Sequence, residues 1–341
     1  MAIVMGLDQH RAQISAEWID TITGEVRRAR VAPADRAAVG KFLARFAGEG
    51  LEVALEATTG WRFVVEELQR IGAEAHLAEP AETSGLRGPK KRAKTDWADA
   101  RHLRELLLIG RLPQSWIPPG HILDLRARVR CRHAVSHQRG EWQQRIHAVL
   151  YHHGIRQRHD LMSTENREWL SKQRLPAAAR EQIRVAVAMI DALDIQLTPL
   201  DKDLRAYARK QSGCKALSDA LYGVGGLTAV TILAELGDAR RFSSSRDVVR
   251  YSGLDITVHQ SDRRRAAGRL SRQGPAALRW ALYEAALRAG FPNSPDRDYY
   301  LQTAERIGGN RARLAIARKL LKRSYHILKA LGDQALEPLP S

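Results

Sequence analysis

The sequence contains few cysteines and no long apolar run, and these absences exclude several classes of protein. Only two cysteines, Cys131 and Cys214, are present in 341 residues, and they stand far apart. This argues against a disulfide framework or a structural zinc site and fits a reducing compartment. No stretch of about 18 apolar residues occurs, and the start MAIVMGLDQH lacks the basic region of a secretory signal. We therefore expect a cytoplasmic protein without a membrane partner.

Acidic side chains are scarce relative to basic ones. The chain holds 55 Lys and Arg against 38 Asp and Glu, giving a formal net charge of +17 and a pI near 10.3. Residues 1–112 carry 17 basic and 16 acidic side chains, so residues 113–341 carry +16 of this charge. Such an excess attracts polyanions, which makes nucleic acid the expected partner. The motif G-x-x-x-x-G-K-[ST] is absent, so nucleotide hydrolysis is not supported.

Short apolar runs alternate with helical spacing in residues 1–112, which predicts an α/β domain with a mixed sheet. The basic, Gly- and Pro-rich stretch 80–94 predicts a mobile loop. Thr95 then caps a helix from Asp96 to about Ile109. The expected strands are 2–7, 14–19, 25–31, 51–55 and 73–78.

The rest of the chain predicts an all-α part. After a Pro-rich linker, residues 122–151 and 177–210 form long charged helices with narrow apolar stripes. Such helices favour an antiparallel coiled-coil hairpin or a coiled coil between subunits, with two helices of a larger bundle as the alternative. The expected domains are 1–112, 113–212 and 213–341.

Four carboxylates stand at positions that suit a metal site. Asp8 and Glu56 each end an apolar strand, whereas Asp96 and Asp99 lie three residues apart at a helix start. Mg²⁺ prefers oxygen ligands, and two ions about 3.5–4 Å apart bind the attacking and leaving oxygens of a phosphodiester exchange. Each residue is also an ordinary surface or first-turn acid. Spacing alone leaves both interpretations open.

Two segments of the last third suit phosphate binding. Gly223-Val224-Gly225-Gly226 separates two apolar helical stretches, as in helix-hairpin-helix DNA binding, although a tight helix–helix turn has the same pattern. An arginine-rich segment follows Gln260-Ser261, with a solvated basic loop as its alternative interpretation. The residues expected to contact nucleic acid are Lys90, Lys91, Arg92, Lys94, Gly223, Gly225, Arg263, Arg264, Arg265, Arg269 and Arg272.

Several ordered blocks of the sequence resemble one family. They are Gly6-Leu7-Asp8, Leu55-Glu56-Ala57-Thr58-Thr59-Gly60-Trp61, Lys94-Thr95-Asp96-Trp97-Ala98-Asp99, Tyr251-Ser252-Gly253-Leu254 and Arg269-Leu270-Ser271-Arg272-Gln273-Gly274. Together they resemble the DEDD transposases, the Piv-invertase-like recombinases of bacterial insertion sequences, in the group numbered one hundred and ten. The resemblance implies an RNase H-like (RuvC-like) N-terminal domain, a coiled-coil middle and a helical transposase domain.

The resemblance also implies roles for particular residues. Asp8, Glu56, Asp96 and Asp99 become a catalytic tetrad that binds Mg²⁺ or Mn²⁺. The family's catalytic serine lies in a Gln-Ser-Gly motif that aligns with Ser261. Here Asp262 stands where glycine is usual, and Ser252 and Ser271 are lesser candidates for the same role.

The implied activity is cutting and rejoining of DNA by Mg²⁺-dependent transesterification with a serine nucleophile. A structured noncoding bridge RNA is expected to pair with donor and target DNA, and a homodimer or homotetramer is the expected assembly. Such a protein would associate with the nucleoid. The alternatives are a RuvC-like structure-specific endonuclease that uses water as nucleophile and a non-catalytic nucleic-acid-binding protein.

Overall fold

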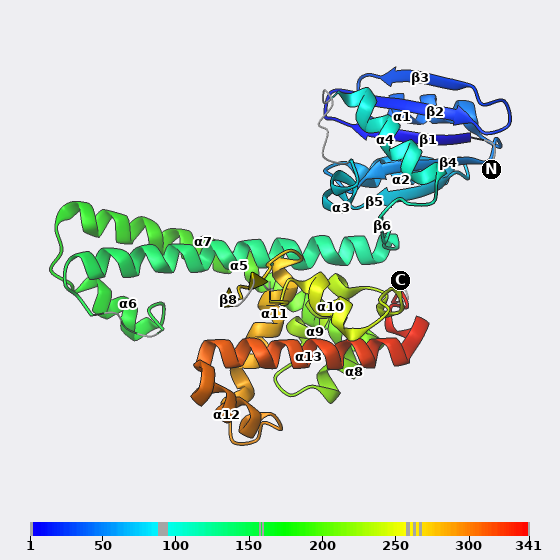
Figure 1. Ribbon diagram of the computed structural model, residues 1–341. Helices are drawn as coiled ribbons and strands as arrows, with labels where there is room; N and C mark the ends of the chain where they lie inside the picture. The colour runs from blue at the N-terminus through cyan, green and yellow to red at the C-terminus, as the bar shows by residue number, and fades with distance from the viewer. Residues whose placement is uncertain are drawn as a thin grey trace. The chain divides into compact units, whose positions relative to one another are not determined.

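The computed structural model describes residues 3–87, 95–156, 158, 160–256, 260–261, 264–265 and 268–339, with the backbone alone for 260–261 and 264–265. The chain divides into two compact units, Met1–Ile117 and Pro118–Ser341 (Figure 1). None of the helices described is long and apolar enough to cross a membrane. The division of the second unit at residue 212 stays a prediction.

The first unit is built on a six-stranded mixed sheet with the order β3-β2-β1-β4-β5-β6. The central strand β1 pairs antiparallel with β2 and parallel with β4, and β6 pairs antiparallel with β5. The order of the first five strands is that of the RNase H-like fold, which confirms the expected fold class. The strands are β1 (Ile3–Gln9), β2 (Ile14–Asp20), β3 (Val26–Val31), β4 (Leu51–Glu56), β5 (Glu74–Ala78) and β6 (Gln114–Ser115).

Helices cover both faces of this sheet because successive strand residues point to opposite sides. Met5 and Leu7 of β1 pack in the same core as α1 (Arg36–Leu43), the short 3₁₀ helix Ala44–Phe46 and α2 (Trp61–Arg70). Val4 packs on the other side with Leu103 and other leucines of α4 (Asp96–Leu108). The sheet therefore lies between two layers of helix, and α4 covers the face on which the even-numbered residues of β1 lie.

Two details of the sequence prediction are corrected. Residues 80–85, expected within a loop, form helix α3 (Pro80–Gly85), because Glu79 caps its start and Pro80 occupies the first turn. Residues 114–115, expected within a linker, form the edge strand β6. Residues 88–94 of the expected loop lie outside the described residues.

The second unit contains an antiparallel helical hairpin, which is one of the arrangements that the apolar stripes allowed. Its long helices are α5 (Gly120–His152) and α7 (Ala177–Lys210), and the short α6 (Thr164–Ser171) lies between them in the chain (Figure 1). Arg132 pairs with Asp201, and Arg139 pairs with Asp194. These pairs are spaced by seven residues on each helix, which is the repeat of a coiled coil.

The remaining helices pack around α9 (Gly226–Leu236), which is buried from Ala229 to its end. A helix that is apolar all round belongs in a core, and α9 contacts α5, α7, α8 and α11. Short 3₁₀ turns span Ala239–Arg241, Leu287–Gly290 and Gly332–Ala335, and a hairpin consists of β7 (Gln260–Ser261) and β8 (Arg264–Arg265). The other helices are α8 (Ser212–Ala220), α10 (Ser245–Ser252), α11 (Ala276–Ala286), α12 (Arg297–Ile307) and α13 (Gly309–Leu331).

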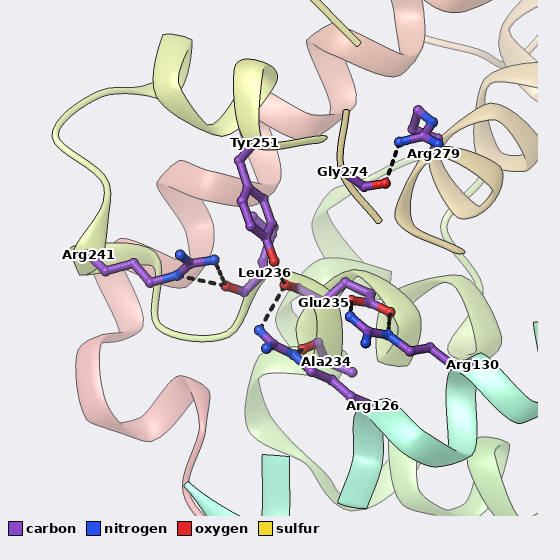
Figure 2. A network of polar contacts seen from close by, with 9 residues as sticks. All are labelled: Arg126, Arg130, Ala234, Glu235, Leu236, Arg241, Tyr251, Gly274 and Arg279. Carbon is purple, nitrogen blue, oxygen red and sulfur yellow. Dashed lines mark hydrogen bonds and ion pairs between the residues drawn. The ribbon is translucent and has the colours of Figure 1, made fainter. Parts of the chain in front are cut away.

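Polar side chains hold the carboxyl end of α9 to its surroundings (Figure 2). Its last three carbonyls accept hydrogen bonds from Arg126 of α5, from the Tyr251 hydroxyl of α10 and from Arg241. Arg130 of α5 makes two bonds of 2.7 Å to the fully buried Glu235 carboxylate. Cations favour the negative end of a helix dipole. These contacts join the hairpin to the helical core that follows it.

Candidate active site

Gly6 places helix α4 directly against the central strand. A Cβ at this position would lie 2.0 Å from the carbonyl oxygen of Ala100 in α4 and 2.7 Å from the amide nitrogen of Arg104. Any larger residue would push the helix away from the sheet. Asp8 follows two residues later, so its side chain lies on the same face of β1. This close approach brings the start of α4 to the strand that carries Asp8.

Asp8 and Glu56 lie side by side at the ends of two parallel strands. The paired residues of β1 and β4 end with Leu7 opposite Leu55, so the next residues along are Asp8 and Glu56. Residues in register on neighbouring strands share a face of the sheet. Asp8 is 9% exposed and Glu56 is partly buried. The structure therefore places both predicted carboxylates at one sheet edge, on the face covered by α4.

Asp96 and Asp99 join this edge from the first turn of α4. Thr95 caps the helix by accepting a hydrogen bond from the Ala98 amide, as predicted. The positive end of the helix dipole lowers the cost of two carboxylates in one turn. Asp99 is buried and Asp96 is partly buried. All four predicted carboxylates thus come from three elements of one unit.

Three side chains that the sequence analysis missed contact these carboxylates. His10 Nε2 lies 3.0 Å from Asp8 Oδ2 and 3.6 Å from Asp96 Oδ1. Gln13 donates a hydrogen bond of 3.1 Å to Asp96, and Arg87 forms an ion pair with Asp99. The spacing Asp8-x-His10 was an available signal, because two residues spaced by two share a face of a strand.

The electrostatics of Asp8 show that negative charge is crowded at this edge. Burial raises the pKa of Asp8 above its ordinary value, and the carboxylates of Asp99 and Asp96 raise it further. His10 acts in the opposite direction through its charge and its hydrogen bond. A carboxylate whose ionised form is disfavoured by its neighbours gains from a nearby cation.

The donor atoms fit a divalent cation. Ligand atoms of Asp8, His10 and Asp96 all lie within 4.8 Å of one another, and carboxylate oxygens are the ligands of hard divalent ions. Ser15, opposite Asp8 in the β1–β2 register, is fully buried, and its hydroxyl has no hydrogen-bond partner among the residues that the structure describes. The cluster therefore offers several oxygens and an unsatisfied hydroxyl in one small region.

The three serines named from the sequence differ in their surroundings. The backbone of Ser261 pairs with Arg264 in the β7–β8 hairpin. Ser252 is fully buried and donates its hydroxyl hydrogen to the Val249 carbonyl at 2.8 Å. Ser271 donates its hydroxyl hydrogen to the carboxylate of Asp255. Ser252 is thereby closed to a DNA strand, which removes it as a candidate nucleophile.

A crossing of two backbones fixes the ends of the segment that contains Ser261. Gly253 has φ +69° and Gly274 has φ +141°, and a Cβ on Gly274 would lie 2.1 Å from the Tyr251 carbonyl oxygen. Arg279 donates hydrogen bonds to the carbonyls of Ser252 and Gly274, at 3.0 and 2.8 Å; Figure 2 shows the bond to Gly274. The positive φ angles and the close backbone atoms explain why positions 253 and 274 are glycines.

The predicted nucleic-acid contacts are only partly described. Gly223 has a packing role, because a Cβ there would lie 2.6 Å from the Ala285 carbonyl oxygen, whereas Gly225 caps α9 with open space around it. Arg269 and Arg272 are exposed, and Arg264 and Arg265 form strand β8. Lys90, Lys91, Arg92, Lys94, Asp262 and Arg263 lie outside the described residues. Binding by all these residues stays a prediction.

The fold and the carboxylate cluster define a domain of the RNase H-like class with four acidic side chains on one face of its sheet. Two family models match the chain: the DEDD transposase model of IS110 elements over residues 5–154, and the model described as "Transposase IS116/IS110/IS902 family" over residues 216–301. The chain belongs to the IS110 family of transposases, with an N-terminal DEDD domain and a C-terminal domain of the second model. A DEDD domain of this kind implies a divalent metal ion.

Individual relatives agree with this assignment. A probable family 20 transposase of Pseudomonas aeruginosa is 27% identical over 149 residues, which are 42% of this chain and 44% of that protein. The transposase for insertion sequence element IS1111A of Coxiella burnetii is 31% identical over 123 residues, or 35% and 34% of the two chains. A putative transposase y4qE of Sinorhizobium fredii is 26% identical over 251 residues, or 73% and 62%. The chain thus aligns with between a third and two thirds of the length of these relatives.

Proposed function

We propose that the protein is a transposase that cuts and rejoins DNA strands at the carboxylate cluster, with Mg²⁺ or Mn²⁺ as its metal. The observation that supports this most strongly is the convergence of Asp8, Glu56, Asp96 and Asp99 from β1, β4 and α4 on one face of an RNase H-like sheet. Among the described residues of this region, His10 lies 3.0 Å from Asp8 and Arg87 forms an ion pair with Asp99.

Each group of residues has a different role in the proposed reaction. The four carboxylates would hold the metal, and the His10 ring and the Gln13 amide keep Asp8 and Asp96 oriented toward each other. Divalent ions, when bound, activate an attacking oxygen and neutralise the phosphate charge. The basic surplus of the second unit supplies the attraction that brings the DNA backbone to the protein.

We further propose Ser261 as the nucleophile. Its Oγ attacks the scissile phosphorus, and a Ser–phosphate ester forms as one phosphorus–oxygen bond of the DNA breaks. The serine proton leaves Oγ, and the departing DNA oxygen is protonated. A DNA hydroxyl reverses the step and rejoins the strand, so the ester energy is conserved and no ATP is required. This agrees with the absence of a nucleotide-hydrolysis motif, and Arg264 and Arg265 stand close by in sequence to balance phosphate charge.

The test is a denaturing gel that detects DNA covalently attached to protein. The wild type incubated with Mg²⁺ and its DNA should form the adduct, and Ser261→Ala should not. Ser271→Ala is the matched control, because its hydroxyl is bound to Asp255 rather than available for attack. An adduct that persists in Ser261→Ala and disappears in Ser271→Ala would move the role to Ser271. Cut DNA without any adduct would establish the endonuclease that uses water.

A bridge RNA that selects the donor and target DNA is the proposed guide. The charge of residues 113–341 supports polyanion binding, and the family resemblance supports RNA in particular. Sequencing the RNA that co-purifies with the protein tests this. A single structured RNA with segments complementary to the DNA sites is the expected result, and random cellular RNA would contradict it.

Self-association into a homodimer or homotetramer is proposed through residues 120–210. Helix α7 leaves Val185, Met189 and Ile195 exposed at 39%, 40% and 68%, although its other face packs on α5. Exposed apolar residues along one helix favour burial against a partner. Sedimentation should show a species larger than the monomer, and a strict monomer with and without nucleic acid would contradict the proposal.

A further inference from the structure

A hollow in the second unit lies between α5 and Trp280 of α11. Its volume is about 510 Å³, and its lining includes His133, His137, Gly140, Arg145 and Trp280. We call it the Trp280 hollow. Its size lies within the range of sites that hold a small organic group. Neither the carboxylate cluster nor the Ser261 segment includes any of these residues.

Aromatic and cationic groups surround the indole of Trp280. The Arg132 guanidinium lies over the ring at 4.9 Å from its centroid, and the His133 ring centroid lies 5.7 Å away. Burial lowers the pKa of His133, and the charges of His137 and Arg132 lower it further. Its Nδ1 atom is buried without a hydrogen-bond partner in the part of the chain that the structure describes. The hollow therefore has an aromatic wall, and its lining also includes the Arg145 guanidinium and the Glu141 carboxylate.

Gly140 lies in the lining and in the interior of the 33-residue helix α5. Glycine weakens a helix interior relative to alanine. Outside the adjoining turns of α5, no described atom lies within 4 Å of the position that a Cβ would occupy. Packing within the chain thus gives no reason for a glycine here. Its absent side chain widens the hollow, as a close approach by a bound group would require.

The hollow is next to the anchor of the Ser261 segment. Trp280 directly follows Arg279, whose guanidinium donates hydrogen bonds to the carbonyls of Ser252 and Gly274 where the two backbones cross. A group bound against Trp280 is therefore one residue from the contact that fixes where this segment begins and ends.

We propose that the Trp280 hollow binds one unpaired base of the DNA strand, stacked against Trp280 and His133. Arg145 also lines the hollow, where its guanidinium lies over the Trp142 ring at 4.0 Å from the centroid, and its charge would attract the neighbouring phosphate. Stacking on aromatic side chains tolerates any base, because every base has a π-face. This inference rests on the proposed function and adds to it a position at which the DNA is locally unpaired beside the cut.

The test uses a duplex with one bulged 2-aminopurine, a fully paired duplex of the same sequence, and an RNA duplex with the same bulge. Trp280→Ala should bind the bulged DNA about 5-fold to 150-fold more weakly, which is the usual loss for one stacked base. Binding of the paired duplex should change less than 2-fold. The wild type should quench the 2-aminopurine fluorescence, and Trp280→Ala should not. Trp280→Phe keeps a ring and should retain most of the affinity.

A second variant keeps the inference testable if Trp280→Ala loses its fold. Gly140→Leu fills the hollow with a good helix former, so its Tm should equal or exceed that of the wild type while bulged-DNA binding falls by a similar factor. Ala134→Leu is the matched control, because it is exposed on the same helix and lies outside the lining. It should bind like the wild type.

Three results would overturn the inference. Unchanged bulged-DNA binding in both Trp280→Ala and Gly140→Leu would remove the site, and retained paired-duplex binding would then leave the proposed function intact. Equal losses for paired and bulged DNA would show a general rather than a base-stacking role. Tighter binding of the bulged RNA, lost in the same variants, would assign the hollow to RNA instead of DNA.

Discussion

The most informative single substitution is Gly6→Ala, because it tests whether the contact between α4 and β1 sets the active geometry. The added Cβ would lie 2.0 Å from the Ala100 carbonyl oxygen, whereas ordinary contact begins near 3.4 Å. Both obstructing groups belong to the backbone of α4, so no side chain can rotate to make room. The helix must retreat from the strand by about 1.4 Å (3.4 minus 2.0).

That displacement moves Asp96 and Asp99 away from Asp8 and Glu56. A misplacement of about 1 Å costs on the order of 100-fold in rate. Overpacking of this kind also destabilises a core by about 1–3 kcal/mol, and two backbone contacts place Gly6→Ala at the upper end. DNA binding should change little, because the basic excess lies in residues 113–341.

The assay compares DNA-cleavage rate, DNA affinity and Tm for the wild type, Gly6→Ala and Gly85→Ala. Gly85 is a matched control, since no described atom lies within 4 Å of a Cβ built there and its φ is not positive. Gly6→Ala should lose about 100-fold or more in cleavage at nearly unchanged affinity, and Gly85→Ala should match the wild type. Wild-type cleavage and Tm in Gly6→Ala would refute the reasoning.

Three further predictions concern charge. Because the pKa of Asp8 is raised in the folded chain, the free energy of unfolding without metal should fall as the pH rises through that pKa. Asp8→Asn should remove this dependence and, in chelator at pH 7, show a Tm at or above that of the wild type; a lower Tm would contradict the crowding of charge. Arg130→Met leaves the buried Glu235 carboxylate unpaired and should destabilise the protein by about 2–3 kcal/mol in denaturant titration, somewhat less than a fully buried pair because the Arg130 side chain is 56% exposed. An unchanged midpoint would argue against this pair as an anchor of α9. Residues 118–341 expressed alone should bind DNA with a steep salt dependence, and residues 1–117 should bind it weakly. Equal affinities of the two fragments would contradict the assignment of DNA binding to the basic excess of the second unit.

Local patterns in the sequence predicted much of the fold and the acids of the site. The apolar runs before Asp8 and Glu56 predicted their strands, and Thr95 predicted the start of α4. These features depend on periodicity and capping, which act over a few residues. The long helices 122–151 and 177–210 were found for the same reason.

Contacts between distant segments could not be predicted in this way. That Gln13 bonds to Asp96 depends on how β2 and α4 meet, across 83 residues of sequence. The crossing of Gly253 and Gly274 likewise needs the three-dimensional path, because each glycine alone resembles an ordinary turn residue. Helix α3 was missed because its Gly and basic neighbours outweighed the Glu79 cap and Pro80 in the composition of residues 80–94.

The most direct test of the carboxylate site compares two glutamates of the same strand. Glu56 lies at the end of β4 beside Asp8, and Glu52 lies on the same face of β4 four residues earlier, near His76. The DNA-cleavage rate in Mg²⁺ is measured for the wild type, Asp8→Asn, Glu56→Gln and Glu52→Gln. The wild type is also measured in chelator, where the rate without metal is expected to be close to zero. We predict a loss of at least about 100-fold in Asp8→Asn and Glu56→Gln and a rate near that of the wild type in Glu52→Gln. Equal rates in Glu56→Gln and Glu52→Gln, or full activity of the wild type in chelator, would contradict a metal site at these carboxylates.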